Sequence, residues 1–368
     1  MKVQVITRHA VTNYGSILQA IATQKIIEKC DCECEIIDYQ REDEHYNQIE
    51  NTLLKQKEGW NKNLVKKMIY LLVRKPSSII AGKKFEKMQK EYLNLSPRYN
   101  SAKELQEKIS DADFYMTGSD QVWGKLACGE YDTSYFLDFV KDDTKKIAFA
   151  ASFGHAVKTE EEQKMFEYNL KKYSRIAVRE DSAVKYLEEM GIAAQQVLDP
   201  TLLITADEWK QLIKKEIPKK YVLVYQIHND KRVGRYAKAF AEKAGLPLIR
   251  ISPFFHQIFR EGKLHYLPDV SEFLAFINNA EYLVTDSFHG TAFAINLNTD
   301  FIEILPNTNT GSRNQSILKL VGLTDRIVTD MDDFSFIDKK IEFNKVNTIL
   351  ESERKKSVTI LKNVLSLK

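Results

Sequence analysis

Short apolar segments alternate with helical patterns along this chain, and the alternation limits the folds it can adopt. Residues 3–7 have the pattern of a strand, residues 16–29 that of an amphipathic helix, and residues 34–39 that of a second strand. A strand, a helix and a strand in this order predict a parallel sheet with right-handed crossovers. After residue 110 the alternation returns, with strands predicted at 114–117, 146–151 and 175–178.

A second series of strands begins after the Asp199-Pro200-Thr201 turn. Its strands are predicted at 221–225, 248–251, 282–285 and 301–304, with helices between them. We therefore expect an α/β protein with two Rossmann-like, doubly wound parallel-sheet domains. The expected domains are residues 1–200, with a helical insertion at about 41–110, and residues 201–335. A polar helix at 207–216 would connect them, and a terminal helix within 336–368 would return to the first domain.

Composition excludes several classes of protein. Of the 368 residues, 43% are hydrophobic and 29% charged, which is typical of a globular protein, and a net charge of +3 argues against nucleic acid as a partner. The longest apolar run, residues 68–73, is too short to cross a bilayer, and no targeting segment is visible, so we expect a cytoplasmic protein. Cys30, Cys32 and Cys34 would share one face of an extended segment, but no second cluster follows, so we expect reduced structural thiols and no metal.

Polar turns follow most of the predicted strands. They are 13–16, 118–121, 152–154 and 179–181 in the first domain, and 226–229, 252–253 and 286–289 in the second. Doubly wound sheets bind ligands at the carboxyl ends of their strands, so this set predicts a binding cleft. Each turn taken alone has a simpler interpretation, because Gly, Ser, Asn and Asp form turns in all proteins.

The turn at Asp286–His289 carries the clearest chemistry. An apolar strand leads into it and an apolar helix, 292–297, leaves it, so Asp286 or Ser287 can cap that helix. The unpaired backbone N–H groups at the start of a helix attract an anion, and here the anion would meet the imidazole of His289. The segment therefore predicts phosphate chemistry in which a proton can be donated.

At these residues the chain resembles the polysaccharide pyruvyl transferase family. The resemblance covers about residues 1–325. Its motifs are Asn13-Tyr14-Gly15, Gly118-Ser119-Asp120-Gln121-Val122-Trp123, Ala177-Val178-Arg179-Glu180, Asp199-Pro200-Thr201 and Thr285-Asp286-Ser287-Phe288-His289-Gly290. The resemblance implies two lobes facing a cleft, as in glycosyltransferases of the B type, with the acceptor side in the first domain and the donor side in the second. The insertion at 41–110 matches nothing in this pattern.

Such enzymes transfer the enolpyruvyl group of phosphoenolpyruvate onto two hydroxyls of a sugar, in capsule, exopolysaccharide or cell-wall glycan synthesis. The resemblance implies phosphoenolpyruvate as co-substrate, no cofactor, and a sugar or lipid-linked oligosaccharide as acceptor. The implied donor residues are Arg179, Ser287, His289, Gly290 and Arg313, of which Arg179 and His289 are catalytic. The implied acceptor-side residues are Asn13, Tyr14, Gly15, Ser119, Asp120 and Gln121.

The chemistry of the donor favours these residue types. Two arginines suit its carboxylate and phosphate, and a histidine can protonate its methylene carbon. Other roles remain open: His289 could be a structural helix-terminus residue or bind phosphate only, and Arg179 could pair with Glu180 or Asp181. Asp120 could be a base or a turn former, and Trp123 could stack on a sugar or fill the core. His9, His155 and His228 follow strands too, but a structural role is favoured for them.

Two further alternatives concern the whole protein. A nucleotide-sugar glycosyltransferase would need an acidic ribose ligand, for which Glu303 is the candidate, and a glycan-binding protein would need no catalytic residues at all. Residues 55–90 carry eleven Lys or Arg and two Glu, interleaved with apolar residues. This stretch could contact acidic lipid peripherally, or be a solvated insertion whose lysines cover the first domain.

Overall fold

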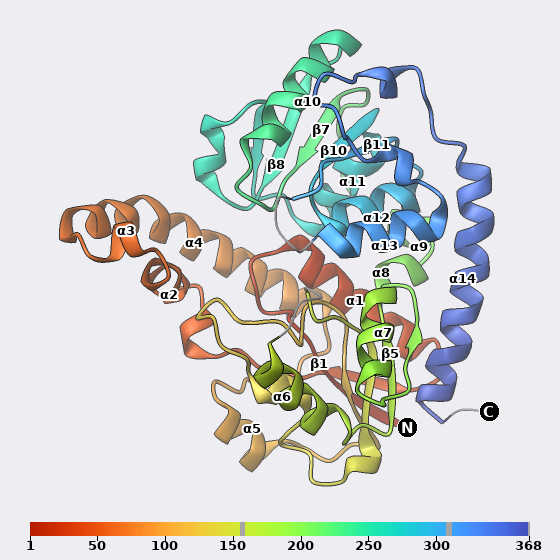
Figure 1. The fold of residues 1–368 in the computed structure, drawn as a ribbon. Helices are drawn as coiled ribbons and strands as arrows, with labels where there is room; N and C mark the ends of the chain where they lie inside the picture. Colours follow the sequence, from red (N-terminus) through yellow and green to blue (C-terminus); the bar gives the residue numbers. More distant parts are fainter. Residues whose placement is uncertain (155–158, 307–310, 367–368) are drawn as a thin grey trace. The chain divides into compact units, whose positions relative to one another are not determined.

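The chain folds into two α/β units, each built on its own parallel sheet. The computed structural model describes residues 1–154, 159–306 and 311–366 (Figure 1). Unit 1 comprises Met1–Leu203 together with the C-terminal residues from Lys356, and unit 2 comprises Ile204–Lys355. Each unit contains one parallel sheet, so the predicted fold class of two parallel α/β sheets is confirmed.

Unit 1 is built on a six-stranded sheet in the order β2-β1-β3-β4-β5-β6. Its strands are β1 (Lys2–Ile6), β2 (Glu33–Ile36), β3 (Phe114–Thr117), β4 (Lys146–Ala151), β5 (Arg175–Val178) and β6 (Gln195–Gln196), and its flanking helices are α1 (Tyr14–Glu28), α6 (Glu160–Leu170), α7 (Asp181–Glu189) and α8 (Pro200–Leu203). All six residues of β4 are buried. Continuous burial of this kind is expected for a parallel strand that helices cover on both faces.

Unit 2 is built on a five-stranded sheet in the order β11-β10-β7-β8-β9. Its strands are β7 (Val222–Tyr225), β8 (Leu248–Ser252), β9 (Lys263–Tyr266), β10 (Tyr282–Thr285) and β11 (Phe301–Glu303), and its helices include α9 (Ala206–Lys210), α10 (Lys231–Ala244), α11 (Val270–Asn279), α12 (Phe288–Leu297) and α13 (Ser312–Val321). All ten residues of α12 are buried. The helix therefore lies inside unit 2, and the turn that begins it follows the carboxyl end of a central strand.

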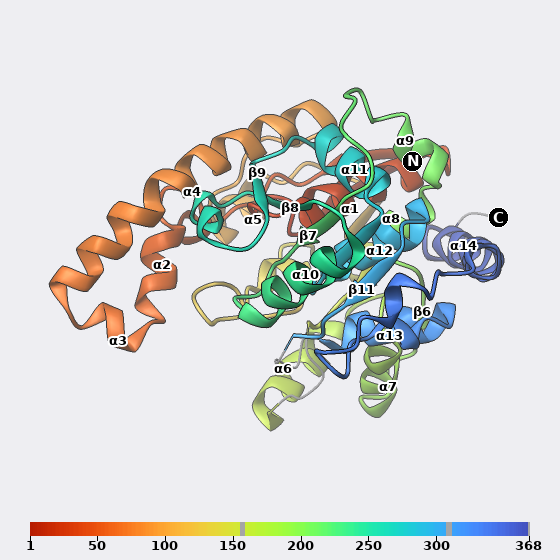
Figure 2. The same cartoon turned by 90° about the horizontal axis from the view of Figure 1, so that it is seen from above.

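The insertion predicted at 41–110 is helical. It contains α2 (Ile49–Lys55), α3 (Glu58–Asn61), α4 (Leu64–Tyr92) and α5 (Ala102–Lys108), and both cartoon views show α3 and the first half of α4 projecting from the rest of unit 1 (Figures 1 and 2). The second half of α4 is anchored in the core, where Phe85 packs on Tyr14 with ring centroids 5.0 Å apart.

The last helix, α14 (Phe343–Val364), belongs to both units along its length. Its residues up to Lys355 belong to unit 2 and those from Lys356 onward to unit 1. In the unit 1 part, Leu361 and Leu365 are fully buried, and the hydroxyl of Ser357 accepts a hydrogen bond from the backbone N–H of Leu198 at 3.0 Å. The C-terminal segment is therefore part of the unit 1 core.

Several local predictions need correction. The helix predicted at 207–216 is shorter, because α9 ends at Lys210, and β6 and β9 were not predicted. The three clustered cysteines do not share an extended segment: Cys34 alone lies in β2, whereas Cys30 precedes a turn at Asp31, which has a φ of 57°. Among the described residues, no helix has the length and apolar character that a membrane span requires.

Candidate active site

The turn between β10 and α12 is fixed by its own side chains. The hydroxyl of Thr285 donates to the carbonyl of Tyr225 at 2.7 Å and accepts from the N–H of Ser287 at 3.0 Å, and the Ser287 hydroxyl caps α12 by accepting from the N–H of Gly290 at 3.3 Å. A Cβ at Gly290 would lie 2.5 Å from the Thr285 hydroxyl oxygen. Glycine at this position therefore lets the first turn of α12 approach the sheet closely.

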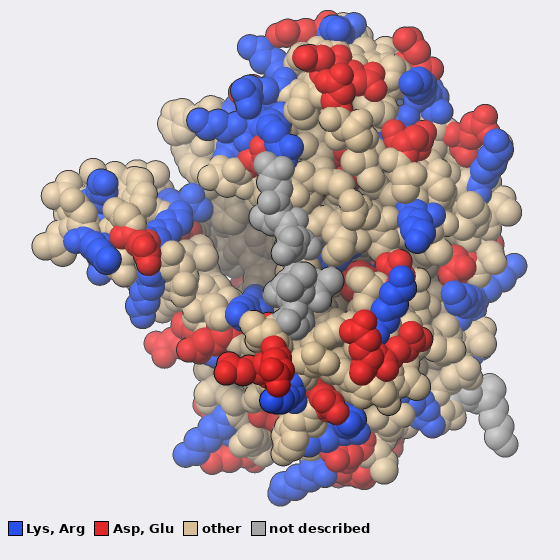
Figure 3. Space-filling model, in the orientation of Figure 1, with Lys and Arg blue, Asp and Glu red and all other residues tan. Residues whose placement is uncertain are grey.

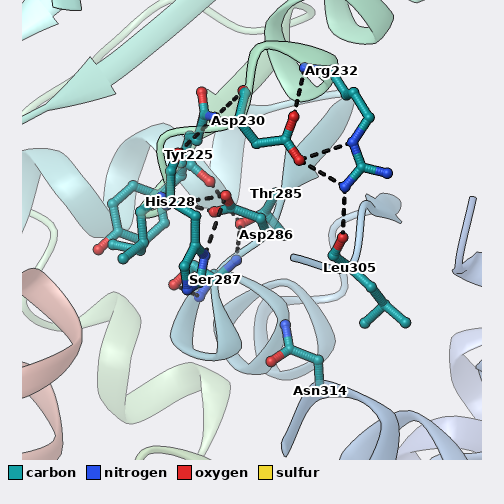
Figure 4. Close-up of polar contacts among 12 residues, drawn as sticks. Tyr225, His228, Asp230, Arg232, Thr285, Asp286, Ser287, Leu305 and Asn314 are labelled. Carbon is teal, nitrogen blue, oxygen red and sulfur yellow. Dashed lines mark hydrogen bonds and ion pairs between the residues drawn. The ribbon is translucent and has the colours of Figure 1, made fainter. Parts of the chain in front are cut away.

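Asp286 joins this turn to the loop that follows β7. Its carboxylate accepts hydrogen bonds from the N–H groups of Ile227 at 2.7 Å and His228 at 3.1 Å, and the Nδ1 of His228 lies 3.4 Å from it (Figure 4). Asp286 itself is only 1% exposed, whereas the His228 side chain is 28% exposed. A structural role was favoured for His228, but the structure places it at the edge of the candidate site, a position that its place after a strand already indicated.

His289 and Arg313 begin two neighbouring helices, α12 and α13. The ring of Phe288 lies next to both: its centroid is 5.1 Å from that of the His289 imidazole and 6.0 Å from the guanidinium carbon of Arg313. His289 is 6% exposed. Ser287, His289, Gly290 and Arg313, which were predicted as donor ligands, therefore all lie in one region of unit 2, at the N-termini of two ten-residue helices. The positive ends of these helices favour an anion there.

Glu303 lies beneath this region and is fully buried. Its carboxyl group contacts the Thr291 hydroxyl and accepts from the Asn314 amide at 2.7 Å, so it connects α12 to α13. Burial raises the pKa of Glu303 to about 8. With both oxygens occupied and no exposed surface, Glu303 does not offer the ribose-binding carboxylate that a nucleotide-sugar glycosyltransferase would need, and that prediction is corrected.

A second ion pair lies close to the same turns. Asp230 caps α10 and binds Arg232 through two contacts, at 2.9 and 2.6 Å, while Arg232 also donates to the carbonyl of Leu305 at 3.2 Å (Figure 4). The arginine thus ties the start of α10 to the segment after β11. Neither residue was singled out from the sequence, although Asp230 has the typical position of a helix cap.

In unit 1, Arg179 follows β5 and is buried among carboxylates. Its guanidinium lies 2.7 Å from Asp199 and 3.1 Å from Glu180, and the side chain is 2% exposed. Burial alone would lower the pKa of Arg179, but the facing carboxylates of Glu180 and Asp199 outweigh it and raise the pKa above its usual range. The alternative in which Arg179 pairs with Glu180 is correct as to the partner. The ion pair is buried, however, and Asp199 is a second partner of the guanidinium.

The acceptor-side residues of unit 1 are divided between turn and core. Asn13 caps α1 by accepting from Gly15 at 2.8 Å, and the carboxylate of Asp120 accepts from the Ser16 hydroxyl at 2.7 Å and from the backbone of Gln121 at 2.8 Å. Ser119 is fully buried, with its hydroxyl 2.8 Å from Asp199. These side chains hold the two turns after β1 and β3 together.

Two aromatic residues singled out from the sequence lie in the core of unit 1. Tyr14 is fully buried against Phe85, so its ring is not available to line an acceptor site. Trp123 is also fully buried, with its ring stacked on Phe136 at 6.2 Å between centroids, so it fills the core instead of stacking on a sugar. Burial of an aromatic residue after a strand depends on tertiary packing, which the local pattern does not specify.

Two other histidines, His9 and His155, also follow predicted strands. His9 is fully buried, with Nε2 3.2 Å from Asp38 and Nδ1 3.2 Å from the carbonyl of Thr7, so the favoured structural role is the one the structure shows. His155 lies outside the described residues.

A polar pocket of about 810 Å³ opens in unit 1 between the insertion and the loop after β3. Its lining comes from the segment after β2, from α2, from the start of α5 and from the loop after β3, and includes Arg41, Asp43, Asn51, Tyr131 and Asp132. Arg41 binds Asp43 at 2.9 and 3.0 Å, and the hydroxyl of Tyr39 donates to Asp132 at 2.7 Å. The lining therefore offers both hydrogen-bond donors and acceptors.

Comparison with solved structures supports the fold assignment. The S. aureus MnaA–UDP structure has a TM-score of 0.55 at 12% identity, over 100% of this chain and 97% of that one. The Arabidopsis thaliana UGT89C1 structure with UDP-L-rhamnose has a TM-score of 0.52 at 9% identity, over 99% and 98%. The UDP-GlcNAc 2-epimerase of Methanocaldococcus jannaschii has a TM-score of 0.51 at 15% identity, over 100% and 99%. At these identities the likeness shows the fold alone, which is that of B-type glycosyltransferases and epimerases.

No curated protein sequence matches the chain significantly. The model of a protein family, however, matches residues 13–309, which include the turn at Asp286–His289, the Arg179 cluster and the whole insertion. The chain therefore belongs to the polysaccharide pyruvyl transferase family.

Proposed function

We propose that the protein transfers the enolpyruvyl group of phosphoenolpyruvate onto two hydroxyls of a glycan sugar, forms a cyclic pyruvate ketal and releases phosphate. Membership of the family supports pyruvyl transfer onto a polysaccharide precursor. The donor, the ketal, a role in capsule, exopolysaccharide or cell-wall glycan synthesis, and a cytoplasmic location are parts of the proposal.

One observation carries the donor assignment: unit 2 gathers a histidine and an arginine at the N-termini of two helices around the ring of Phe288. A donor with a phosphate and a carboxylate needs cationic and N–H groups at two points. In the proposal Arg313 and the N–H groups near Ser287 and Gly290 bind those two anionic ends. His289 is then the candidate for contact with the carbons between them.

The proposed chemistry begins with a proton from His289 to the methylene carbon of the donor. The adjacent carbon becomes an oxocarbenium-like electrophile, and a first sugar hydroxyl attacks it and loses its proton. Phosphate then leaves with its bonding electrons, and the second hydroxyl closes the ketal ring and loses a proton in turn. General acid catalysis of this type contributes about 10²–10⁴-fold to the rate. No metal or organic cofactor enters any of these steps.

We propose a mainly indirect role for Arg179, although its motif suggested direct contact with the donor. A trianion that approached it would meet the carboxylates of Glu180 and Asp199, and at least one of them would have to give way. We therefore propose two separable roles. Arg179 keeps Ser119 and Asp199 in position, and it contacts donor only after exchange of a carboxylate.

The acceptor is proposed to bind unit 1, at the turns that contain Asn13, Gly15, Asp120 and Gln121. The pocket beside α2 offers polar lining of the kind that binds a further sugar unit. A free glycan or a lipid-linked oligosaccharide would satisfy this lining equally. A lipid-linked acceptor would bring the protein into peripheral contact with a membrane.

The test is phosphate release from phosphoenolpyruvate over a panel of hexoses, N-acetylhexosamines and lipid-linked oligosaccharides, with the ketal product identified by mass spectrometry. We expect release that depends on acceptor and is strongly reduced in Arg313→Gln, whereas Arg235→Gln, on α10, behaves as wild type. Calorimetric titration with uridine diphosphate discriminates the rival function. Tight binding of that nucleotide with no response to phosphoenolpyruvate would favour a nucleotide-sugar glycosyltransferase.

A further inference from the structure

The first half of α4 presents an apolar surface to solvent. Between Trp60 and Val73 seven large hydrophobic side chains are at least 42% exposed, and Leu64 reaches 82%. The seven are Trp60, Leu64, Val65, Met68, Ile69, Leu72 and Val73. Folded proteins rarely leave such a continuous patch uncovered, and a patch of this kind marks a surface that binds a partner or a membrane. These seven residues, Trp60 on α3 and the other six on α4, form what we call the α4 apolar face.

The first half of α4 exposes its apolar side to solvent, whereas an ordinary surface helix buries that side. Tyr70 points toward α2, where it is 6% exposed and donates to Glu50 at 2.8 Å, and Arg74 contacts the same carboxylate at 3.2 Å. Met68 and Leu72 lie two positions on either side of Tyr70, which is about 200° around a helix, and so on the opposite side. A solvated surface helix would carry polar residues there.

Basic residues surround the α4 apolar face. Residues 55–75 contain seven Lys or Arg and one acidic residue, Glu58. In the space-filling view, the projecting part of the molecule shows uncharged surface with several basic patches and a smaller acidic one (Figure 3). An apolar face with lysines at its borders is the pattern of helices that lie in the interface of an acidic bilayer, because the lysines reach the anionic headgroups while the apolar side chains enter the acyl region.

We propose that the hairpin of α3 and α4 docks on an anionic lipid surface through the α4 apolar face. The charge pattern favours lipid over a second copy of this chain, because two copies meeting at this face would bring their lysines together. The anchoring of α4 also suits docking, since Glu50 and the buried second half of the helix hold the projecting part in place. The proposed contact does not depend on the pyruvyl-transfer chemistry.

The three tryptophans of the chain provide the measurement. Trp60 is 42% exposed, whereas Trp123 and Trp209 are fully buried, so only Trp60 can respond to a bilayer. Vesicles of equimolar phosphatidylcholine and phosphatidylglycerol should shift its emission to the blue, and lipids brominated on their acyl chains should quench it. Vesicles of phosphatidylcholine alone should give a much weaker response, and added salt should weaken binding to the anionic vesicles. Trp60→Phe should remove the optical signal while vesicle flotation persists.

Variants separate the docking face from the rest of the protein. The triple variant Leu64→Asp, Met68→Asp, Leu72→Asp should weaken flotation with anionic vesicles about tenfold or more. Reversing charge with Lys66→Glu and Lys67→Glu should remove the preference for anionic lipid. Tyr168→Glu, which changes an exposed aromatic residue on α6 outside the α4 apolar face, is the control and should bind as wild type.

Two results would overturn the proposal. One is flotation of the wild type that is equal with and without phosphatidylglycerol, or absent with both. The other is a lipid-free wild type that elutes as a dimer in light scattering while the triple Asp variant elutes as a monomer, which would assign the α4 apolar face to a second copy. Because neither measurement contains donor or acceptor, failure here leaves the proposed activity untouched.

Discussion

At the scale of single residues, the hydrogen-bond partners of Thr291 bear on the protonation state of Glu303. The Thr291 hydroxyl has one hydrogen, yet it lies in contact with two acceptors, the carbonyl of Ser287 at 3.1 Å and the carboxyl group of Glu303. Both contacts are satisfied when Thr291 donates to the carbonyl and a protonated Glu303 donates to Thr291. The geometry therefore agrees with a pKa that burial raises to about 8.

A pH dependence of stability follows from Glu303. Its pKa is raised on folding, so its contribution is full below about pH 4.5, falls as pH rises and is lost above about 8. Between these limits the free energy of unfolding should fall by at most about 1.4 kcal/mol per pH unit on account of this group. Urea unfolding of wild type and Glu303→Gln across this range measures the effect. The difference between the two proteins should change with pH, and parallel curves would show that Glu303 is ionised in the folded state.

His289 carries the sharpest prediction about activity. In His289→Gln an amide replaces the imidazole, so hydrogen bonding to phosphate is retained but proton donation is lost. Phosphate release should fall by about 10²–10⁴-fold with the midpoint of thermal unfolding nearly unchanged. His265→Gln, on β9, is the control. Retention of full activity by His289→Gln would assign the imidazole to phosphate binding only.

At the scale of elements, the contact of α12 with its sheet rests on Gly290. In Gly290→Ala the new methyl group would lie 2.5 Å from the Thr285 hydroxyl oxygen and 3.1 Å from the Tyr225 ring. The helix would have to move away from β10, at a cost of about 1–3 kcal/mol. We expect a lower midpoint of thermal unfolding. The same change at Gly59 on α3, where nothing lies within 4 Å, should be neutral or slightly stabilising.

The sequence allowed most elements to be predicted where burial is continuous. Strands β3, β4, β5 and β10 have the predicted bounds, because parallel strands that are covered on both faces are mainly apolar. The two-residue β6 and the polar edge strand β9 lack that signal. Which face of the first half of α4 is buried could not be predicted either, since the apolar residues there are exposed and a sequence pattern does not reveal which side is covered.

The candidate site was predictable in part and for a definite reason. A turn after a strand is recognisable from local residue types, so the position of Ser287, His289 and Gly290 at the start of a helix could be anticipated. The partners of these turns come from distant segments: Asp286 binds the loop after β7, and Arg179 binds Asp199. Contacts of this kind depend on which strands are neighbours, and no local pattern contains that information.

At the scale of the whole molecule, α14 makes unit 1 depend on the end of the chain. Removal of residues from Lys356 onward deletes the buried Leu361 and Leu365 and leaves the backbone N–H of Leu198 without the Ser357 hydroxyl. Loss of a single buried leucine side chain costs about 2–5 kcal/mol, so calorimetry should show a markedly lower transition for the truncated chain. Leu361→Ala should give a smaller shift in the same direction, and Lys362→Ala should give little. A truncated protein that melts like the full-length chain would contradict this role of α14.

Because the C-terminal segment belongs to unit 1, the two units can complete their folding only in a certain order during translation. When the ribosome has made the first 203 residues, the sheet of unit 1 still lacks the segment that closes its core, and all of unit 2 must emerge before that segment arrives. Unit 2 is contiguous in sequence and can mature while translation continues. The nascent N-terminal portion therefore waits with apolar surface uncovered, and we expect a chaperone to bind it during elongation.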